Sequence, residues 1–231
     1  MIRPTSIAVL AIAALVAAGC GSDDSDGGDT TSTTASATPT VITKATASSD
    51  LTDALGDTAA TLTDAGCTFG TFEEEEAKHV DEGDDLESKT FPPTSGRHYG
   101  DWAPFGLYTE PIDDGFAVHN LEHGGVVVWL GSEVDDATTE AIADLLDDDE
   151  KWLVVPRPDL DGLYSAAWAT GLSCPPAALT KLGPDDTAAA LDAWYDVVES
   201  TGSEAEKDVP AYAGAMKEPT PERDISTEAP F

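Results

Sequence analysis

Residues 126–130, a run of three valines, a tryptophan and a leucine, constrain the fold of this chain more than any other segment. β-Branched and aromatic residues in so short an apolar run predict a strand that is buried on both faces. Gly124 and Gly125 stand before the run and Gly131 stands after it, so the strand has clear limits at both ends. The core of the domain is therefore expected to form around this strand.

The pattern after this strand predicts a fold of mixed elements. Residues 132–145 open with a helix-start pattern and then place apolar residues on one helical face. Residues 152–155 and 164–170 predict two further strands, and residues 184–198 predict a second helix with a proline in its first turn. This order favours an α+β domain, in which a small mixed β-sheet has helices packed on one face. Residues 68–117 form a long irregular segment, which is usually functional in a domain of this size.

The N-terminal residues predict export. Arg3 precedes a continuous apolar run over residues 7–18, which is short for a mature membrane-spanning helix. The small residues before Cys20 resemble the lipobox of bacterial lipoproteins, although Ala17 stands where leucine is usual. The resemblance implies a signal peptide over residues 1–19, lipidation of Cys20 and an extracytoplasmic protein anchored to the cell membrane. The alternative is an ordinary secretory signal that contains a cysteine.

Composition divides the rest of the chain into three parts. Residues 20–50 are mostly Ser, Thr, Asp and Gly, which predicts a disordered acidic tether. Residues 51–202 hold the globular domain, and residues 203–231, rich in Pro, Glu and Asp, predict a loose C-terminal tail. The chain has 45 acidic and 11 basic residues, a formal net charge of -34. Such a charge repels phosphates, so nucleic acid is excluded as a partner.

Two cysteines remain in the mature chain, Cys67 and Cys174. Export implies an oxidising compartment, where an even pair of cysteines predicts a disulfide. The alternative is a pair of free thiols that bind a metal ion.

The histidines are concentrated in one part of the sequence. All four lie in the same stretch of 45 residues, and they are His79, His98, His119 and His123. Imidazole is the commonest metal ligand, so the cluster predicts a copper or zinc site. His98, His119 and His123 would bind the ion, and His79 or Glu122 would complete or support the site. Each histidine by itself has a structural alternative, such as a hydrogen-bonded core side chain. We expect the acidic surroundings to raise the histidine pKa values, so that metal binding weakens as the pH falls.

A shorter pattern suggests a second chemistry. Residues 119–123 read HNLEH and fit H-x-x-E-H, in which two histidines hold zinc and the glutamate acts as a general base. Glu122 would then be the catalytic residue of a zinc hydrolase. The pattern needs a long helix, whereas Gly124 and Gly125 leave room for at most one turn around these residues.

Two longer motifs resemble a known family. Residues 91–98 read FPPTSGRH and residues 118–126 read VHNLEHGGV. They resemble the prokaryotic family catalogued as domain of unknown function 3105, over about residues 67–174, and the resemblance implies no established activity. It includes both cysteines and places five residues among the signature positions: His79, His98, His119, Glu122 and His123. We expect eight further motif residues to shape the site: Pro92, Pro93, Thr94, Ser95, Gly96, Asn120, Gly124 and Gly125.

Three hypotheses of function remain. The first is a lipid-anchored extracytoplasmic domain that binds a transition metal through its histidines. The second is a metal-free module that contacts an envelope protein through residues 100–115, which carry Trp102, Phe105 and Tyr108. The third is the zinc hydrolase, and none of the three names a substrate.

Overall fold

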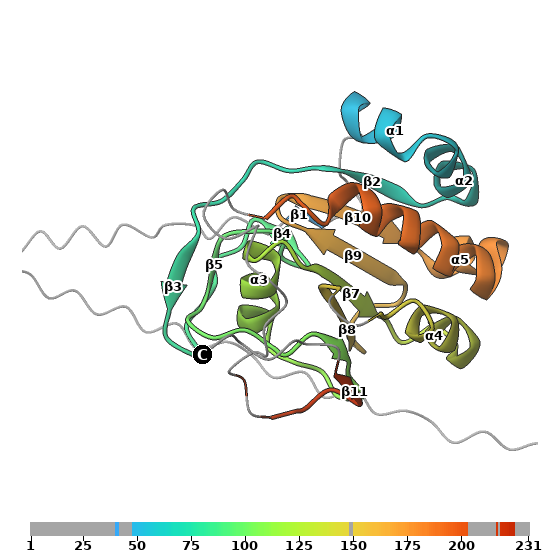
Figure 1. Cartoon of the computed structure of the whole chain (residues 1–231). Coiled ribbons are helices and arrows are strands. Elements are labelled where there is room, and N and C mark those ends of the chain that lie inside the picture. Colours follow the sequence, from blue (N-terminus) through green and yellow to red (C-terminus); the bar gives the residue numbers. More distant parts are fainter. Residues whose placement is uncertain (1–39, 42–47, 148–149, 203–215, 217, 225–231) are drawn as a thin grey trace, which may run out of the picture. The chain divides into compact units, whose positions relative to one another are not determined.

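The computed structural model describes residues 40–41, 48–147, 150–202, 216 and 218–224, and these form the folded part of the chain in Figure 1. The predicted signal peptide, most of the predicted tether and most of the predicted tail lie outside the described residues. Within them, none of the helices is long and apolar enough to cross a membrane.

The core of the domain is a seven-stranded mixed sheet with the strand order β11-β6-β8-β7-β9-β10-β2. The central strand β7 is parallel to β8 and antiparallel to β9. The bounds of the strands are β2 (Thr68–Thr71), β6 (Gly106–Leu107), β7 (Val126–Leu130), β8 (Trp152–Pro156), β9 (Leu163–Ala167), β10 (Thr170–Cys174) and β11 (Arg223–Asp224). The predicted central strand is confirmed, and every residue of it is buried.

One predicted strand is in fact two. Residues 164–170 were expected to be continuous, but the chain reverses at Trp168 and Ala169, and β9 and β10 pair as an antiparallel hairpin. Ala169 has a φ of 53°, a left-handed conformation that tight hairpin turns require and that Gly or Asn usually supplies. An alanine at this position gives no sequence signal of a turn, so the prediction was wrong here.

Among the described residues, five helices accompany the sheet: α1 (Ser49–Leu55), α2 (Asp57–Ala65), α3 (Asp114–Glu122), α4 (Asp136–Ala143) and α5 (Pro176–Val198). Helix α4 begins within the predicted range, where the side chain of Asp135 accepts a hydrogen bond from the backbone N–H of Thr138 at 2.8 Å. Helix α5 is longer than predicted because a first segment from Pro176 precedes a kink at Gly183. The predicted helix start at Pro184 is the start of the second segment.

The helices lie on both faces of the sheet, whereas we expected them on one. Strands β6, β8 and β7 are parallel neighbours, and the chain passes from β6 through α3 to β7 and then back through α4 to β8. Right-handed crossovers in opposite directions along a sheet place α3 and α4 on opposite faces, as Figure 1 shows. On the α4 side, α5 also covers the sheet, and its Tyr195 stacks on Trp152 of β8 with ring centroids 4.4 Å apart. The α+β class itself is confirmed.

The last strand, β11, belongs to the segment that we expected to be a loose tail. It pairs antiparallel with β6 at the edge of the sheet. Glycine at position 106 permits this pairing, because a Cβ there would lie 1.9 Å from the carbonyl oxygen of Arg223. Arg223 also donates to the backbone carbonyls of Ala143 and Leu146 near the end of α4.

Two short parallel pairs lie outside the main sheet and involve strands of the long irregular segment. One joins β1 (Thr40–Val41) to β4 (Thr90–Phe91), and the other joins β3 (Lys78–Val80) to β5 (Arg97–Tyr99). The predicted disulfide between Cys67 and Cys174 is present, with Cα atoms 4.3 Å apart. It ties the start of β2 to the end of β10, so the two cysteines are not free thiol ligands.

Candidate metal centre

Two of the histidines lie side by side on the β3–β5 pair. His79 of β3 is the register partner of His98 of β5, and their ring centroids are 4.9 Å apart. The side chain of His98 is fully buried, whereas that of His79 is 60% exposed. The pair therefore offers one interior imidazole and one at the surface.

Helix α3 brings two further groups to the same place. His119 and Glu122 stand three residues apart, so they share one face of the helix. The helix is longer than the single turn that we expected, because Asp113 caps its first turn and Gly115 lets it approach β5 closely. A Cβ at Gly115 would lie 2.5 Å from the ring of Tyr99, so a side chain at this position would push α3 away from the histidines of the strand pair.

The four groups converge on one point. One ligand atom from each of His79, His98, His119 and Glu122 can be chosen so that all four lie within 4.8 Å of one another. The Oε2 atom of Glu122 is 2.9 Å from Nε2 of His98 and 3.9 Å from Nε2 of both His79 and His119. Residues far apart in the sequence thus form a cluster of three imidazoles and one carboxylate.

Backbone carbonyls fix the orientation of the two buried rings in this cluster. The Nδ1 atom of His98 is 2.8 Å from the carbonyl oxygen of Gly96, and that of His119 is 2.8 Å from the carbonyl oxygen of Tyr99. A carbonyl oxygen only accepts, so each Nδ1 must carry the proton and donate it. Nε2 is then the remaining nitrogen of each ring that could bind a metal ion, and hydrogen bonds of this kind at Nδ1 are how proteins orient metal-binding histidines.

Nε2 of His98 is poorly satisfied. It is buried, and it makes no hydrogen bond of acceptable geometry among the described residues, although the carboxylate of Glu122 is close by. A lone pair that faces a carboxylate oxygen at this distance is repelled by it unless a proton or a cation lies between the two atoms. The buried end of the cluster therefore favours a positive charge at its centre.

The protonation states also suit a cation. Burial, together with the nearby His123 and His98, lowers the pKa of His119 to about 4. Burial would raise the pKa of Glu122, but contacts with His98, His119 and His79 outweigh it and lower this pKa. At neutral pH the cluster is thus expected to hold a neutral imidazole at His119 and an ionised carboxylate, which are the forms that bind metals.

Our expectation that the acidic surroundings raise the histidine pKa values is wrong for two residues. The pKa of His123, like that of His119, is lowered to about 4, and burial is the largest cause in both. The free-energy cost of removing a charged imidazole from water exceeds its attraction to the carboxylates around it.

His123 lies beside the cluster and is not one of the four converging groups. Its Nε2 atom is 3.1 Å from Nε2 of His119. The ring of Trp102 lies against both histidines, with centroid distances of 5.2 Å to His119 and 4.6 Å to His123. We expected His123 to be a ligand, and the structure places it next to the four converging groups, in contact with His119.

The motif residues around the cluster act mainly through the backbone. Buried Thr94 hydrogen-bonds Thr90 and bonds to Ala169 through its carbonyl, and the Ser95 hydroxyl accepts from the backbone N–H of Glu75. These bonds hold the turn in which Gly96, at a φ of 108°, directs its carbonyl to His98.

On the other side of the cluster, the side chain of Asn120 pairs with both backbone groups of Ala103 and so ties the preceding loop to α3. Gly124, at a φ of 76°, ends the helical turn. A Cβ at Gly125 would lie 2.7 Å from the carbonyl oxygen of Asn120, so the entry to β7 needs this glycine. Pro92 and Pro93 are buried ahead of the turn.

Sequence reasoning missed three residues of the surroundings. The carbonyl of Tyr99 orients His119, the indole of Trp168 donates to Glu74 at 2.8 Å beside His98, and Trp102 packs on two histidines. A backbone carbonyl leaves no trace in a sequence. The Ala-Trp pair at residues 167–168 also resembles the family, and this pair was the available signal for Trp168.

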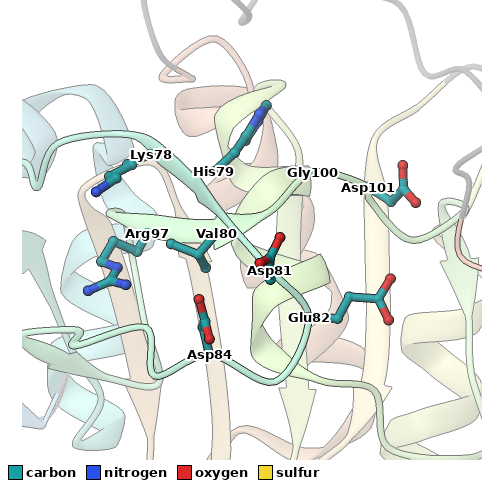
Figure 2. A pocket seen from close by; sticks show the side chains of 9 residues that line it. All are labelled: Lys78, His79, Val80, Asp81, Glu82, Asp84, Arg97, Gly100 and Asp101. Carbon is teal, nitrogen blue, oxygen red and sulfur yellow. The ribbon is translucent and has the colours of Figure 1, made fainter.

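An open groove of about 610 Å³ adjoins the cluster on the side of His79. Figure 2 shows the nine residues that line it: Lys78, His79, Val80, Asp81, Glu82, Asp84, Arg97, Gly100 and Asp101. His79 is the residue that the groove shares with the cluster, and its exposed side chain gives the cluster an end that faces solvent. Four carboxylates and two basic side chains give the lining an acidic balance.

The segment that we expected to contact a protein partner does not expose its aromatic residues. Phe105 and Tyr108 are buried in the core, and Trp102 is half-buried against the histidines. The aromatic residues of this segment therefore do not form an exposed apolar patch, and that argument for an interaction module was wrong.

The fold and the site together define an α+β domain in which a buried helix and a two-stranded ribbon enclose a cluster of three histidines and a glutamate. Residues 79–183 match the model of the family described as protein of unknown function (DUF3105), so the resemblance inferred from the motifs is confirmed. The match begins at His79 and contains the whole cluster. No curated protein and no solved structure matches the chain.

Proposed function

We propose that this domain binds one transition-metal ion, zinc or copper(II), through His79, His98, His119 and Glu122. The observation that carries the proposal is the buried Nε2 atom of His98, which lies 2.9 Å from the carboxylate of Glu122 without a hydrogen bond of acceptable geometry among the described residues. A metal ion between these two atoms would bond to both of them.

The spacing of the donors supports this proposal. Zinc–nitrogen bonds of about 2.0–2.1 Å place neighbouring ligand atoms of a tetrahedral site about 3.3 Å apart. The distances from Glu122 Oε2, 2.9 and 3.9 Å, bracket this value. To reach the tetrahedral spacing, the exposed side chain of His79 would move toward the other three ligand atoms.

The chemistry of the donors narrows the choice of ion. Three imidazole nitrogens and one carboxylate oxygen are borderline to hard ligands, which suit zinc and copper(II). Soft copper(I) prefers thiolates, and both cysteines of the domain are held in the disulfide. A fourth ligand at the surface, beside an acidic groove, would also let the ion enter and leave without opening the core.

We further propose that the domain works outside the cytoplasm, anchored to the membrane through lipidated Cys20. The lipobox-like N-terminus supports this, and so does the disulfide, since such bonds form and persist in oxidising compartments. The role would then be metal handling at the cell envelope, with an envelope protein as a candidate partner.

The decisive experiment measures metal content. The full chain is purified in detergent without a histidine tag, exposed to zinc or copper(II), dialysed and analysed by mass spectrometry. We expect about one ion per chain, and loss of most of it in a His79→Ala, His98→Ala double variant. Glu140→Gln, an exposed change on α4 across the sheet, is the matched control and should keep its ion. Wild-type protein without stoichiometric metal would refute the proposal.

The zinc-hydrolase hypothesis is less well supported. It requires Glu122 to stand beside the metal as a base, with His119 and His123 as ligands. In the structure the carboxylate of Glu122 is itself among the ligand atoms, and His123 is outside that group. We therefore propose binding of the metal and no hydrolytic reaction.

A further inference from the structure

His123 is the one histidine that the proposed site leaves without a role. It is buried directly after Glu122, and its Nε2 atom lies 3.1 Å from Nε2 of His119. That atom of His119 is the one that would bind the metal. The contact with His123 therefore involves the same atom of His119 on which binding of the metal ion would depend.

The direction of this hydrogen bond follows from the other side of the His119 ring. Nδ1 of His119 donates to the carbonyl of Tyr99, so the neutral ring has only a lone pair at Nε2. Two lone pairs cannot form a hydrogen bond, so Nε2 of His123 must carry a proton and donate it to His119. The metal-free domain thus has a donor on the lone pair that a metal ion needs.

We propose that His123 is a latch, a positioning residue that occupies the metal-binding lone pair of His119 in the metal-free domain and releases it when the ion binds. The inference rests on the proposed function and adds to it a way in which the domain regulates binding of the metal ion. An imidazole nitrogen has a single in-plane lone pair, so the bond to His123 and the bond to the metal exclude each other.

The surroundings hold the latch in place. The ring of Trp102 packs against His123 at a centroid distance of 4.6 Å, and Lys151 Nζ donates to the backbone carbonyl of His123 at 2.7 Å. These contacts keep the ring next to His119 rather than at the groove where His79 lies. The latch then lowers the affinity for the ion by the strength of one hydrogen bond between neutral groups, about fivefold.

Two variants distinguish the effect of the hydrogen-bond donor of His123 from the effect of its aromatic ring. His123→Phe keeps an aromatic ring for Trp102 to pack against but removes the donor, whereas His123→Gln retains a side-chain N–H near the position of Nε2. Zinc affinity and uptake rate are measured for the full chain by competition with a fluorescent chelator at pH 7.5. We expect the Phe variant to bind zinc about fivefold more tightly and to take it up faster, and the Gln variant to resemble the wild type.

Cobalt(II) substitution tells whether His123 is instead a ligand. If it is a latch, the visible absorption spectrum of the cobalt-loaded Phe variant matches that of the wild type. Weaker binding with an altered spectrum would make His123 a ligand and overturn the proposal. Unchanged zinc affinity in the Phe variant would overturn it too.

A measurement on the metal-free protein keeps the latch separate from the metal proposal. ¹⁵N NMR of the imidazole rings should show His119 protonated at Nδ1, with Nε2 accepting a hydrogen bond that disappears in the His123→Phe variant. A His119 ring protonated at Nε2 would overturn the latch whether or not the protein binds zinc. Wild-type protein with the expected ring state but no bound metal would overturn the proposed function, and with it the regulatory role of His123. The ring state is read in the wild type, so this test stands even if the Phe variant fails to fold.

Discussion

Nε2 of His98 and Oε2 of Glu122 lie 2.9 Å apart in the interior of the domain, and the ring of His98 is oriented so that this nitrogen faces the carboxylate. At this distance a proton or a metal ion has to lie between the two atoms, because a bare nitrogen lone pair and a carboxylate oxygen would repel each other. The fold maintains the contact because the carbonyl of Gly96 orients one partner and helix α3 carries the other.

Replacing Glu122 with glutamine tests this relationship directly. The side-chain amide introduced by Glu122→Gln can donate to Nε2 of His98, so this variant should stabilise the metal-free domain and raise its melting temperature by about 2–4 °C for each kcal/mol gained. The same change removes the anionic ligand, so zinc affinity should fall at least tenfold. Calorimetry without metal and a zinc titration measure the two effects, with Glu140→Gln as the control for loss of a carboxylate. A Glu122→Gln variant that binds zinc as tightly as the wild type would show that Glu122 is not a ligand.

Acid should destabilise the metal-free domain through its buried histidines. The pKa of His119 and of His123 is lowered to about 4 in the folded state, from 6.5 for the free side chain. Below pH 6.5 the unfolded chain therefore binds protons that the folded chain does not, and stability falls until the pH reaches about 4. The loss corresponds to about 3 kcal/mol for one such histidine. Urea unfolding at several pH values measures it, and the His123→Phe variant should show a shallower decline. If stability fell equally with pH in the wild type and in the His123→Phe variant, His123 would not have the lowered pKa assigned to it.

The sequence predicted the parts of the fold in which neighbouring residues determine the structure. The strand at residues 126–130 could be read because it is apolar throughout and bounded by glycines. The turn at Ala169 and the edge strand at Arg223 could not, because an alanine in the left-handed conformation and a short polar pair depend on their tertiary neighbours.

The candidate site was predicted in composition but not in geometry. The crowding of four histidines into one segment indicated a shared site, and His79, His98 and His119 do converge with Glu122. The different position of His123 depends on how α3 packs against β5, through Gly115 and Tyr99, and no local pattern encodes this contact. We did not predict helices on both faces of the sheet for a related reason. Helix α3, which covers the second face, lies at the end of the segment that lacked a regular pattern.

The disulfide should contribute strongly to stability. Cys67 and Cys174 close a loop with a sequence separation of 107, for which the chain-entropy model gives about 4–5 kcal/mol. A Cys67→Ala, Cys174→Ala variant should therefore have a lower urea midpoint, with a slope at least as steep because its unfolded chain exposes more surface. Its zinc affinity at a temperature where it is folded should be unchanged, because the sulfurs are not ligands. A loss of metal in the folded variant would contradict the three-histidine and glutamate site.

Membrane anchoring is tested at Cys20, which lies outside the described residues. If the thiol is lipidated, cells fed a labelled fatty acid should yield labelled protein, and the protein should partition into detergent on phase separation. Cys20→Ser removes the acceptor atom and should abolish both properties, whereas the Cys67→Ala, Cys174→Ala variant should keep them because neither of those sulfurs receives the lipid. The Cys20→Ser chain should still be folded and bind zinc, since the anchor and the metal centre are separate parts of the sequence. Label in the Cys20→Ser protein would place the lipid elsewhere, and absence of label in the wild type would favour an ordinary secretory signal.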